Sequence, residues 1–294
     1  MKFALPLLLS YATLHYSVAQ EPQWVTTSDF ELIRANESNT TLVLFPCFPC
    51  KAVDTKREFN IVEQARLNNI SVLFMNYNRK LFMQEHEKAT LADLLLKTIE
   101  DHQLPKNLVI GGFSGGGNVT LLLSNYLIKQ QEEIKLSKIF IVDAPVDLLA
   151  LYRSSEYHLK QDLNEDVLGE STFLINWFKR DLGNPDMGIA SYEKFSPYTH
   201  ETGNLSNVNE LKKTEIRFYT EPDVTWWKQI YNDTYGQLNA YSIEKMSEAL
   251  QSDMGNSRVE LIITENRGYR SDGTRHPHSW SIVDKEELIS WIID

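Results

Sequence analysis

Short runs of apolar, mostly β-branched residues recur along the chain and predict the strands of a sheet. The six runs cover residues 41–45, 71–75, 108–111, 139–142, 216–220 and 259–264. Most of them are continuously apolar rather than alternating, which is typical of strands covered on both faces. A weaker run at residues 30–34 predicts one further strand at an antiparallel edge of the sheet.

Between these runs, apolar residues recur at helical spacing. The helical patterns cover residues 55–67, 91–102, 116–131 and, after the last strand, 286–293. Thr90 with Asp93, and Asp284 with Glu287, have the spacing of helix-starting caps. Alternation of buried strands with helices predicts an α/β fold, a mostly parallel sheet with helices on both faces, in a single domain.

One stretch, at about residues 147–215, is much longer than a single crossover helix requires. It is rich in aromatic residues and shows helical spacing between Phe173 and Leu182. We expect a helical cap insertion over the carboxyl edge of the sheet. The alternative is a pair of packing helices without a role at the site.

The amino-terminal segment has the features of a signal peptide. Lys2 precedes an apolar stretch from Leu5 to Val18, and Ser17-Val18-Ala19 forms a small-x-small cleavage sequence. We therefore expect residues 1–19 to be removed and the mature chain, residues 20–294, to be exported to the periplasm or secreted. The apolar stretch is too short and too interrupted for a membrane span, so stable membrane anchoring is not expected.

Charge and size exclude some classes of partner. The formal net charge of −11 disfavours nucleic acid and anionic membranes. A chain of this length can bury a substantial core without disulfides or metals to hold it together. Neither property identifies a substrate.

The most specific motif lies where the strand at 108–111 ends. The sequence from Leu108 to Asn118 runs from an apolar strand into Gly-x-Ser-x-Gly and then into a helical pattern. This context predicts a sharp strand-to-helix turn with Ser114 at its tip and Gly112 and Gly116 allowing close packing. The alternative is a glycine-rich structural turn.

A serine hydroxyl needs a base before it can act as a nucleophile. Reactive groups gather at the carboxyl ends of the strands in an open parallel sheet. Only His276 and His278 follow the last predicted strand. His278 is the preferred base because Ser279-Trp280 leads directly into the closing helix, and His276 is the alternative.

The base in turn needs an acid that fixes its tautomer. Asp223 follows the strand at 216–220 and is the preferred acid by strand position. Asp143 and Asp147, after the preceding strand, are alternatives that can instead cap a helix. Glu221 is a less favoured substitute.

Two amide groups are needed to bind the negative oxygen of a tetrahedral intermediate. Gly115, directly after the serine, supplies one. The second should come from the loop at 46–50 after the first buried strand. Its prolines have no N–H, so only Cys47, Phe48 and Cys50 can donate.

The chain resembles the α/β-hydrolase superfamily in three features. These are the order of Ser114, Asp223 and His278 along the sequence, the glycine-flanked turn, and the long insertion. The resemblance spans nearly the whole mature chain, with only the turn specific as a motif. It implies acyl transfer to water through a serine ester, with no metal or organic cofactor. Members commonly carry His-Gly at the oxyanion loop. Pro46 and Cys47 stand there in this chain, which puts Phe48 at the donor position.

We expect a carboxylic ester as the substrate, a small molecule or short peptide derivative. A serine exopeptidase or amidase on the same fold is the first alternative. Trp226 and Trp227, with the aromatic residues of the insertion, favour an apolar or ring-bearing group in the substrate.

Cys47 and Cys50 support a function of another class. Cys-x-x-Cys between a strand and a helix is similar to the redox motif of thioredoxin-like proteins, so a thiol–disulfide oxidoreductase is an alternative. We expect the pair instead to form a short structural disulfide in an oxidising compartment, which would also rigidify the oxyanion loop. A non-catalytic binding protein with the hydrolase fold is the remaining possibility.

Overall fold

The structure is a computed structural model that describes residues 23–77, 80–130 and 134–294. The predicted signal peptide, residues 1–19, lies outside these ranges. Within them, no helix combines the length and the apolar character needed to cross a bilayer.

The described residues form an eight-stranded sheet with the strand order β1-β2-β4-β3-β5-β6-β7-β8. The strands are β1 (Gln23–Thr26), β2 (Phe30–Arg34), β3 (Thr40–Phe45), β4 (Ile70–Met75), β5 (Asn107–Phe113), β6 (Lys135–Val142), β7 (Glu215–Thr220) and β8 (Val259–Ile263). Strands β3 to β8 run parallel, whereas β1 and β2 are antiparallel. All six predicted strands and the antiparallel strand at 30–34 are confirmed, although β1 takes the outermost position.

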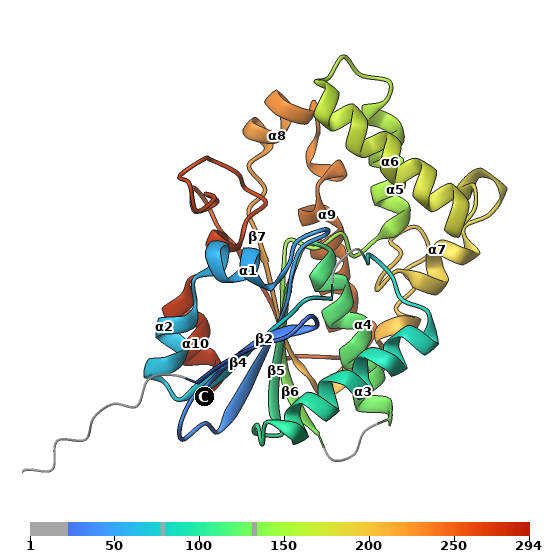
Figure 1. Cartoon of the computed structure of the whole chain (residues 1–294). Helices are drawn as coiled ribbons and strands as arrows, with labels where there is room; N and C mark the ends of the chain where they lie inside the picture. Colours follow the sequence, from blue (N-terminus) through green and yellow to red (C-terminus); the bar gives the residue numbers. More distant parts are fainter. Residues whose placement is uncertain (1–22, 78–79, 131–133) are drawn as a thin grey trace, which may run out of the picture.

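Helices cover both faces of the sheet (Figure 1). On one face lie α1 (Ala52–Phe59), α2 (Val62–Leu67) and α10 (Lys285–Ile293); on the other lie α3 (Glu85–Asp101), α4 (Gly115–Gln130) and α9 (Asn239–Ser252). Alternate residues of each strand point to opposite faces. Leu42 and Leu44 of β3 therefore join the core under α1, whereas Val43 and Phe45 join the core under α4.

Each predicted helical pattern falls on a helix of the structure, but two boundaries were wrong and α8 (Val224–Tyr231) and α9 were not predicted. The pattern at 55–67 is two helices, α1 and α2, because Asn60 adopts a left-handed conformation with φ 45° and ends α1. Thr90 does not start a helix: α3 begins at Glu85, where Gln84 and Glu87 form the capping box. The predicted cap at Asp284 is confirmed, since its carboxylate accepts hydrogen bonds from the amides of Glu286 and Glu287.

A third group of helices lies beyond the carboxyl ends of the strands, at the top of Figure 1. It comprises α5 (Leu148–His158), α6 (Glu165–Asp181) and α7 (Ala190–Phe195), which share a separate apolar core. The rest of the 147–215 stretch contains η1 (Pro185–Met187) and η2 (Ser206–Lys213), and η2 packs back onto the core under α4. Only the first part of the stretch therefore lies over the sheet edge.

A second connection adds to this layer. After β7 come α8 (Val224–Tyr231) and η3 (Tyr235–Gln237), and η4 (Trp280–Ile282) precedes the final helix.

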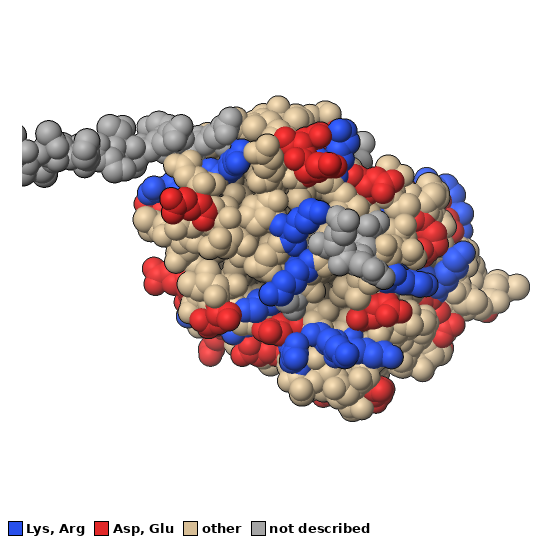
Figure 2. Space-filling view, turned by 90° about the horizontal axis from the view of Figure 1, so that it is seen from below, with Lys and Arg blue, Asp and Glu red and all other residues tan. Residues whose placement is uncertain are grey.

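The side of the molecule shown in Figure 2 carries acidic and basic side chains spread over the same surface. The negative net charge is thus not gathered into one acidic region on that side.

Candidate active site

Ser114 occupies the predicted turn between β5 and α4. Its φ of 55° lies in the left-handed region, where residues other than glycine are uncommon. Its amide donates to the carbonyl of Val142 at 2.9 Å, and its carbonyl accepts from the amide of Gly117 at 2.9 Å. The turn is therefore fixed on both sides by backbone hydrogen bonds, which can hold a strained conformation in place.

The two glycines flanking the turn are required by close backbone contacts. A Cβ on Gly112 would lie 2.1 Å from the carbonyl oxygen of Gly116. A Cβ on Gly116 would lie 2.4 Å from the carbonyl oxygen of Pro46, in the loop after β3. Any larger residue would push α4 away from the strands, so the predicted role of both glycines is confirmed.

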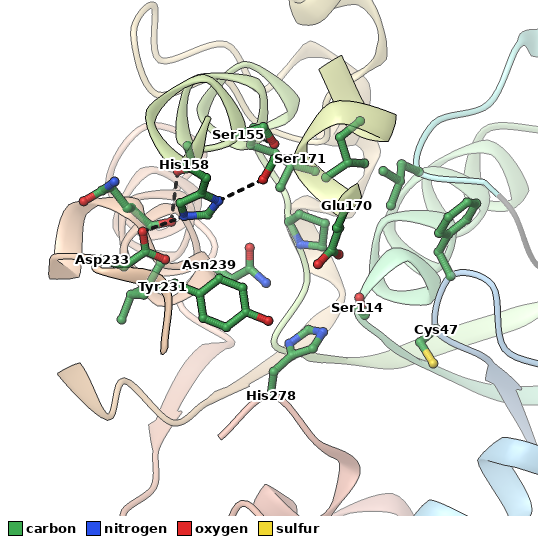
Figure 3. Close-up of a pocket in the computed structure, with 18 of the residues that line it drawn as sticks. Cys47, Ser114, Ser155, His158, Glu170, Ser171, Tyr231, Asp233, Asn239 and His278 are labelled. Carbon is green, nitrogen blue, oxygen red and sulfur yellow. Dashed lines mark hydrogen bonds and ion pairs between the residues drawn. The ribbon is translucent and has the colours of Figure 1, made fainter. Parts of the chain in front are cut away.

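His278 lies beside this turn and pairs with a buried carboxylate. Its Nδ1 is 2.6 Å from Oδ2 of Asp143, and Asp143 is only 5% exposed. Its ring packs on Phe113, the residue before Ser114, with 4.5 Å between the ring centroids. Ser114 and His278 both line one cavity, and Figure 3 shows them at the same end of it.

Asp143 is held rigidly at the end of β6. Its φ is 43°, and its amide donates to the carbonyl of Tyr219 in the neighbouring strand at 2.9 Å. Thr220 donates its hydroxyl to the second carboxylate oxygen at 3.0 Å, and Asn239 donates to the backbone carbonyl at 3.0 Å. One carboxylate oxygen is therefore left for the imidazole, which fixes the ring orientation and tautomer.

The preference for Asp223 as the acid is corrected by this arrangement. Asp223 caps α8 by accepting from the amide of Trp226 at 3.0 Å, and it pairs with Arg275 at 2.7 Å. Glu221 and Pro222 carry the chain past the sheet edge before Asp223 is reached, whereas Asp143 directly follows β6. The partner of His278 is thus one strand closer to the serine than predicted.

Asp147, the other alternative, has a structural position. Its carboxylate accepts from the amides of Leu149 and Ala150 at the start of α5, and from the amide of His200. Burial raises the pKa of this carboxyl group, while the three backbone hydrogen bonds oppose the shift. Asp147 therefore anchors the first helix over the sheet edge.

Glu221, considered as a substitute acid, holds the loop that carries the histidine. It is 3% exposed and accepts from the amides of Arg267 at 2.9 Å and Gly268 at 3.1 Å. Arg275 lies 2.6 Å from one of its oxygens and bridges to Asp223. The loop between β8 and η4 is thereby attached to the end of β7.

His276 lines the same cavity, but its described contacts do not include Asp143. Its ring packs against Trp226 at 4.9 Å between centroids, and its Nδ1 is buried without a partner in the described part of the protein. Burial, with electrostatic repulsion from His278 and Arg270 adding to it, lowers the pKa of His276 to about 3. His276 is therefore neutral near pH 7.

The loop after β3 lies against Gly115, as the oxyanion prediction requires. A Cβ on Gly115 would be 3.3 Å from the Cβ of Phe48. Cys47 and Cys50 are joined by a disulfide, and the amide of Cys50 donates back to the carbonyl of Cys47 at 2.7 Å. Of the three amides considered, that of Cys50 is therefore used within the loop.

The ring of Phe48 points away from the sheet, toward α6. It stacks on Trp177 at 5.3 Å and on Phe173 at 5.9 Å between centroids. The loop is thus fixed by a covalent link at its base and by aromatic packing at its tip.

The cavity has a volume of about 410 Å³, which is in the usual range for a small-molecule site. Trp227 lines it, as predicted for a substrate-binding residue. Trp226 is not among the lining residues and packs instead on His276 and Tyr231.

Several polar lining residues were not predicted. Among them are His158, Glu170, Ser171, Tyr231, Asp233 and Asn239. These residues come from α5, α6, α8, the segment after α8 and the start of α9, and no local motif relates them. His158 lies at the end of a helix in the long insertion, away from the segment after the last strand where the catalytic base is expected.

No protein-family model matches the chain, and none of the curated proteins matches it in sequence. Solved structures do match. An esterase of Pyrococcus furiosus has a TM-score of 0.56 at 15% identity, with 98% of this chain and 94% of that chain covered.

Two further matches have similar scores. A fluorophosphonate-binding serine hydrolase of Staphylococcus aureus, solved with substrate bound, has a TM-score of 0.56 at 12% identity over 93% of this chain and 99% of that chain. A carboxyl esterase of the fungus Tuber melanosporum has a TM-score of 0.54 at 15% identity over 95% and 87%. With the parallel sheet and the strand order, these matches establish that the chain has the α/β-hydrolase fold.

Proposed function

We propose that this protein is a serine hydrolase that cleaves carboxylic esters. The observation that carries the proposal is the 2.6 Å contact between His278 and the buried Asp143, in the same cavity as the strained Ser114. A carboxylate on one ring nitrogen leaves the other nitrogen free to take the proton of a serine hydroxyl. The esterase and serine-hydrolase neighbours support the same reaction class.

In the proposed reaction, His278 takes the proton as Ser114 Oγ attacks the ester carbonyl. The amides of Gly115 and Phe48 would donate to the resulting oxyanion. His278 then protonates the departing alcohol, and the acyl group remains on the serine as an ester. Water, deprotonated by the same imidazole, attacks this ester and releases the acid and the free enzyme.

Labelling with a fluorophosphonate probe tests the nucleophile. The wild-type protein should be labelled at Ser114, and Ser114→Ala should lose both the label and ester hydrolysis. Ser124→Ala, a buried serine further along α4, is the matched control and should keep both. Labelling that survives Ser114→Ala would remove Ser114 from the mechanism.

Substrate panels separate the ester proposal from its alternatives. Chromogenic esters of increasing chain length should be hydrolysed much faster than the corresponding aminoacyl anilides. The reverse preference would favour a serine exopeptidase or amidase. Insulin reduction that is lost in Cys47→Ser would instead favour a thiol–disulfide oxidoreductase, and folded protein that ignores the probe but keeps a ligand would favour a binding role.

We also propose that residues 1–19 direct export and are cleaved before Gln20. The disulfide between Cys47 and Cys50 supports an oxidising compartment, where such bonds persist. Mass spectrometry of protein recovered from the native host should give a mature chain beginning at Gln20. Recovery of the intact amino terminus would contradict this.

A further inference from the structure

A second serine–histidine–aspartate arrangement lines the same cavity. His158 at the end of α5 is 2.8 Å from Oδ1 of Asp233 through Nε2, and 3.2 Å from Oγ of Ser171 on α6 through Nδ1. All three are well shielded: the side chains of His158 and Asp233 are 11% and 5% exposed, and Ser171 is 2% exposed. Figure 3 shows both contacts as dashed lines.

This group is separated from the reaction centre. In Figure 3, His158, Asp233 and Ser171 lie at one end of the cavity, and Ser114 and His278 lie at the other. All five line the same space. The cavity therefore gives a substrate whose carbonyl lies at Ser114 room to extend toward His158.

The second arrangement does not have the geometry of a nucleophilic centre. Ser171 lies in the middle of α6, where the neighbouring backbone amides are occupied by the helix itself. The aspartate and serine also sit on the opposite ring nitrogens from those used at a serine triad. Its chemistry is therefore that of hydrogen bonding.

The hydrogen bonds of this group leave a site that can both donate and accept. With Nε2–H donating to Asp233, the neutral ring accepts the hydroxyl proton of Ser171, whose oxygen lone pairs are then free. If the ring is protonated, it donates to Ser171, whose hydroxyl proton is then free. A hydroxyl group, which is both donor and acceptor, fits either state.

We propose that His158, Asp233 and Ser171 form a subsite for a hydroxyl group on the substrate, remote from the ester carbonyl. The inference rests on the proposed ester hydrolysis at Ser114 and names the substrate class for it. A purely apolar chain would cover these polar groups without replacing their contact with water, which disfavours binding. Asn239 and Tyr231 extend the polar lining between the two ends of the cavity.

Two pairs of esters of matched shape test the subsite. The first pair is the monobutyrate of butanediol and pentyl butyrate, which differ by a terminal hydroxyl in the alcohol part. The second is propyl hydroxyhexanoate, with its hydroxyl at the chain end, and propyl heptanoate, which differ in the acyl part. The wild-type protein should prefer the hydroxylated member of one pair in kcat/KM, and that pair identifies the part of the ester that reaches Ser171.

Ser171→Ala is the test variant and Ser155→Ala is its matched control. Both serines are 2% exposed and both line the cavity, but the Ser155 hydroxyl already donates to the Leu151 carbonyl at 2.9 Å within α5. Ser171→Ala should lower the preference for the hydroxylated ester about tenfold. The loss should appear in KM for the hydroxylated ester rather than in kcat.

Asp233→Asn provides a second variant that keeps the shape of the cavity. It should reduce the same preference, because the amide no longer fixes which ring nitrogen of His158 carries the proton. An unchanged preference in both variants, or an equal loss in Ser155→Ala, would overturn the subsite. If the wild-type protein hydrolyses the apolar esters in that case, the proposed function stands; hydrolysis of none of the four esters would overturn both.

Discussion

Replacing Asp143 and Asp223 separately by asparagine gives opposite expectations for the two candidate acids. In Asp143→Asn the amide can still accept from Thr220, but no carboxylate faces His278. The imidazole tautomer is then no longer fixed and its positive charge is no longer stabilised. Loss of this carboxylate in a serine triad reduces kcat by about 10,000-fold, which corresponds to about 5 kcal/mol of transition-state stabilisation.

Asp223→Asn should leave the reaction almost unchanged. Asparagine caps helices as well as aspartate does, so α8 keeps its first hydrogen bond. The lost ion pair with Arg275 joins side chains that are 27% and 21% exposed. Such a pair contributes about 0.5–1 kcal/mol to the free energy of unfolding.

The assay is kcat for a chromogenic butyrate ester, measured with thermal unfolding of both variants. Asp143→Asn should unfold within a few degrees of wild type while losing nearly all activity. A folded Asp143→Asn variant with kcat within tenfold of wild type, alongside a large loss in Asp223→Asn, would refute the assignment. It would instead favour Asp223 as the acid.

Four further substitutions address the residues that hold the site in place or surround it. Gly112→Ala should destabilise the fold by about 3 kcal/mol in urea unfolding, because its Cβ would meet a carbonyl oxygen at 2.1 Å. Gly169→Ala in α6 should instead stabilise the fold by up to about 1 kcal/mol, because no atom lies within 4 Å of the added Cβ. Glu221→Gln should lower kcat about tenfold with little change in KM, because the loop carrying the histidine loses its charged anchor; a change in KM alone would contradict this. Burial lowers the pKa of His276 to about 3 in the folded protein, so this imidazole binds a proton more readily in the unfolded chain. Unfolding free energy should therefore fall below pH 6.5 by at most about 1.4 kcal/mol per pH unit, and His276→Asn should remove that part of the slope.

The strands could be predicted because both faces of the sheet are buried. A run such as Leu42 to Phe45 has to be apolar throughout when alternate residues enter two different cores. Helix starts were harder because several residues compete for them. Thr90 had a capping sequence, yet its hydroxyl donates to the carbonyl of His86 inside α3, while Gln84 takes the cap.

The site was predictable only as far as its residues share a local motif. Ser114 follows from its flanking glycines, and His278 from its position after the last strand. Asp143 and Asp223 both follow strands, and the choice between them depends on how far each turn carries the chain beyond the sheet. His158 and Asp233 are 75 residues apart, and nothing in either local sequence indicates that the two segments meet.

The conformation of the loop after β3 depends both on its own sequence and on its contacts with distant residues. Prolines at 46 and 49 restrict its amide donors, and the turn closed by Cys50 leaves Cys47 and Phe48 as the two amides that remain. Phe48 sits against Gly115 while its ring packs on α6. A glycine in its place would lose that aromatic contact, and a helix layer that shifted would move the ring and the amide together. The position of the proposed oxyanion donor therefore depends on α6, the helix that also carries Ser171.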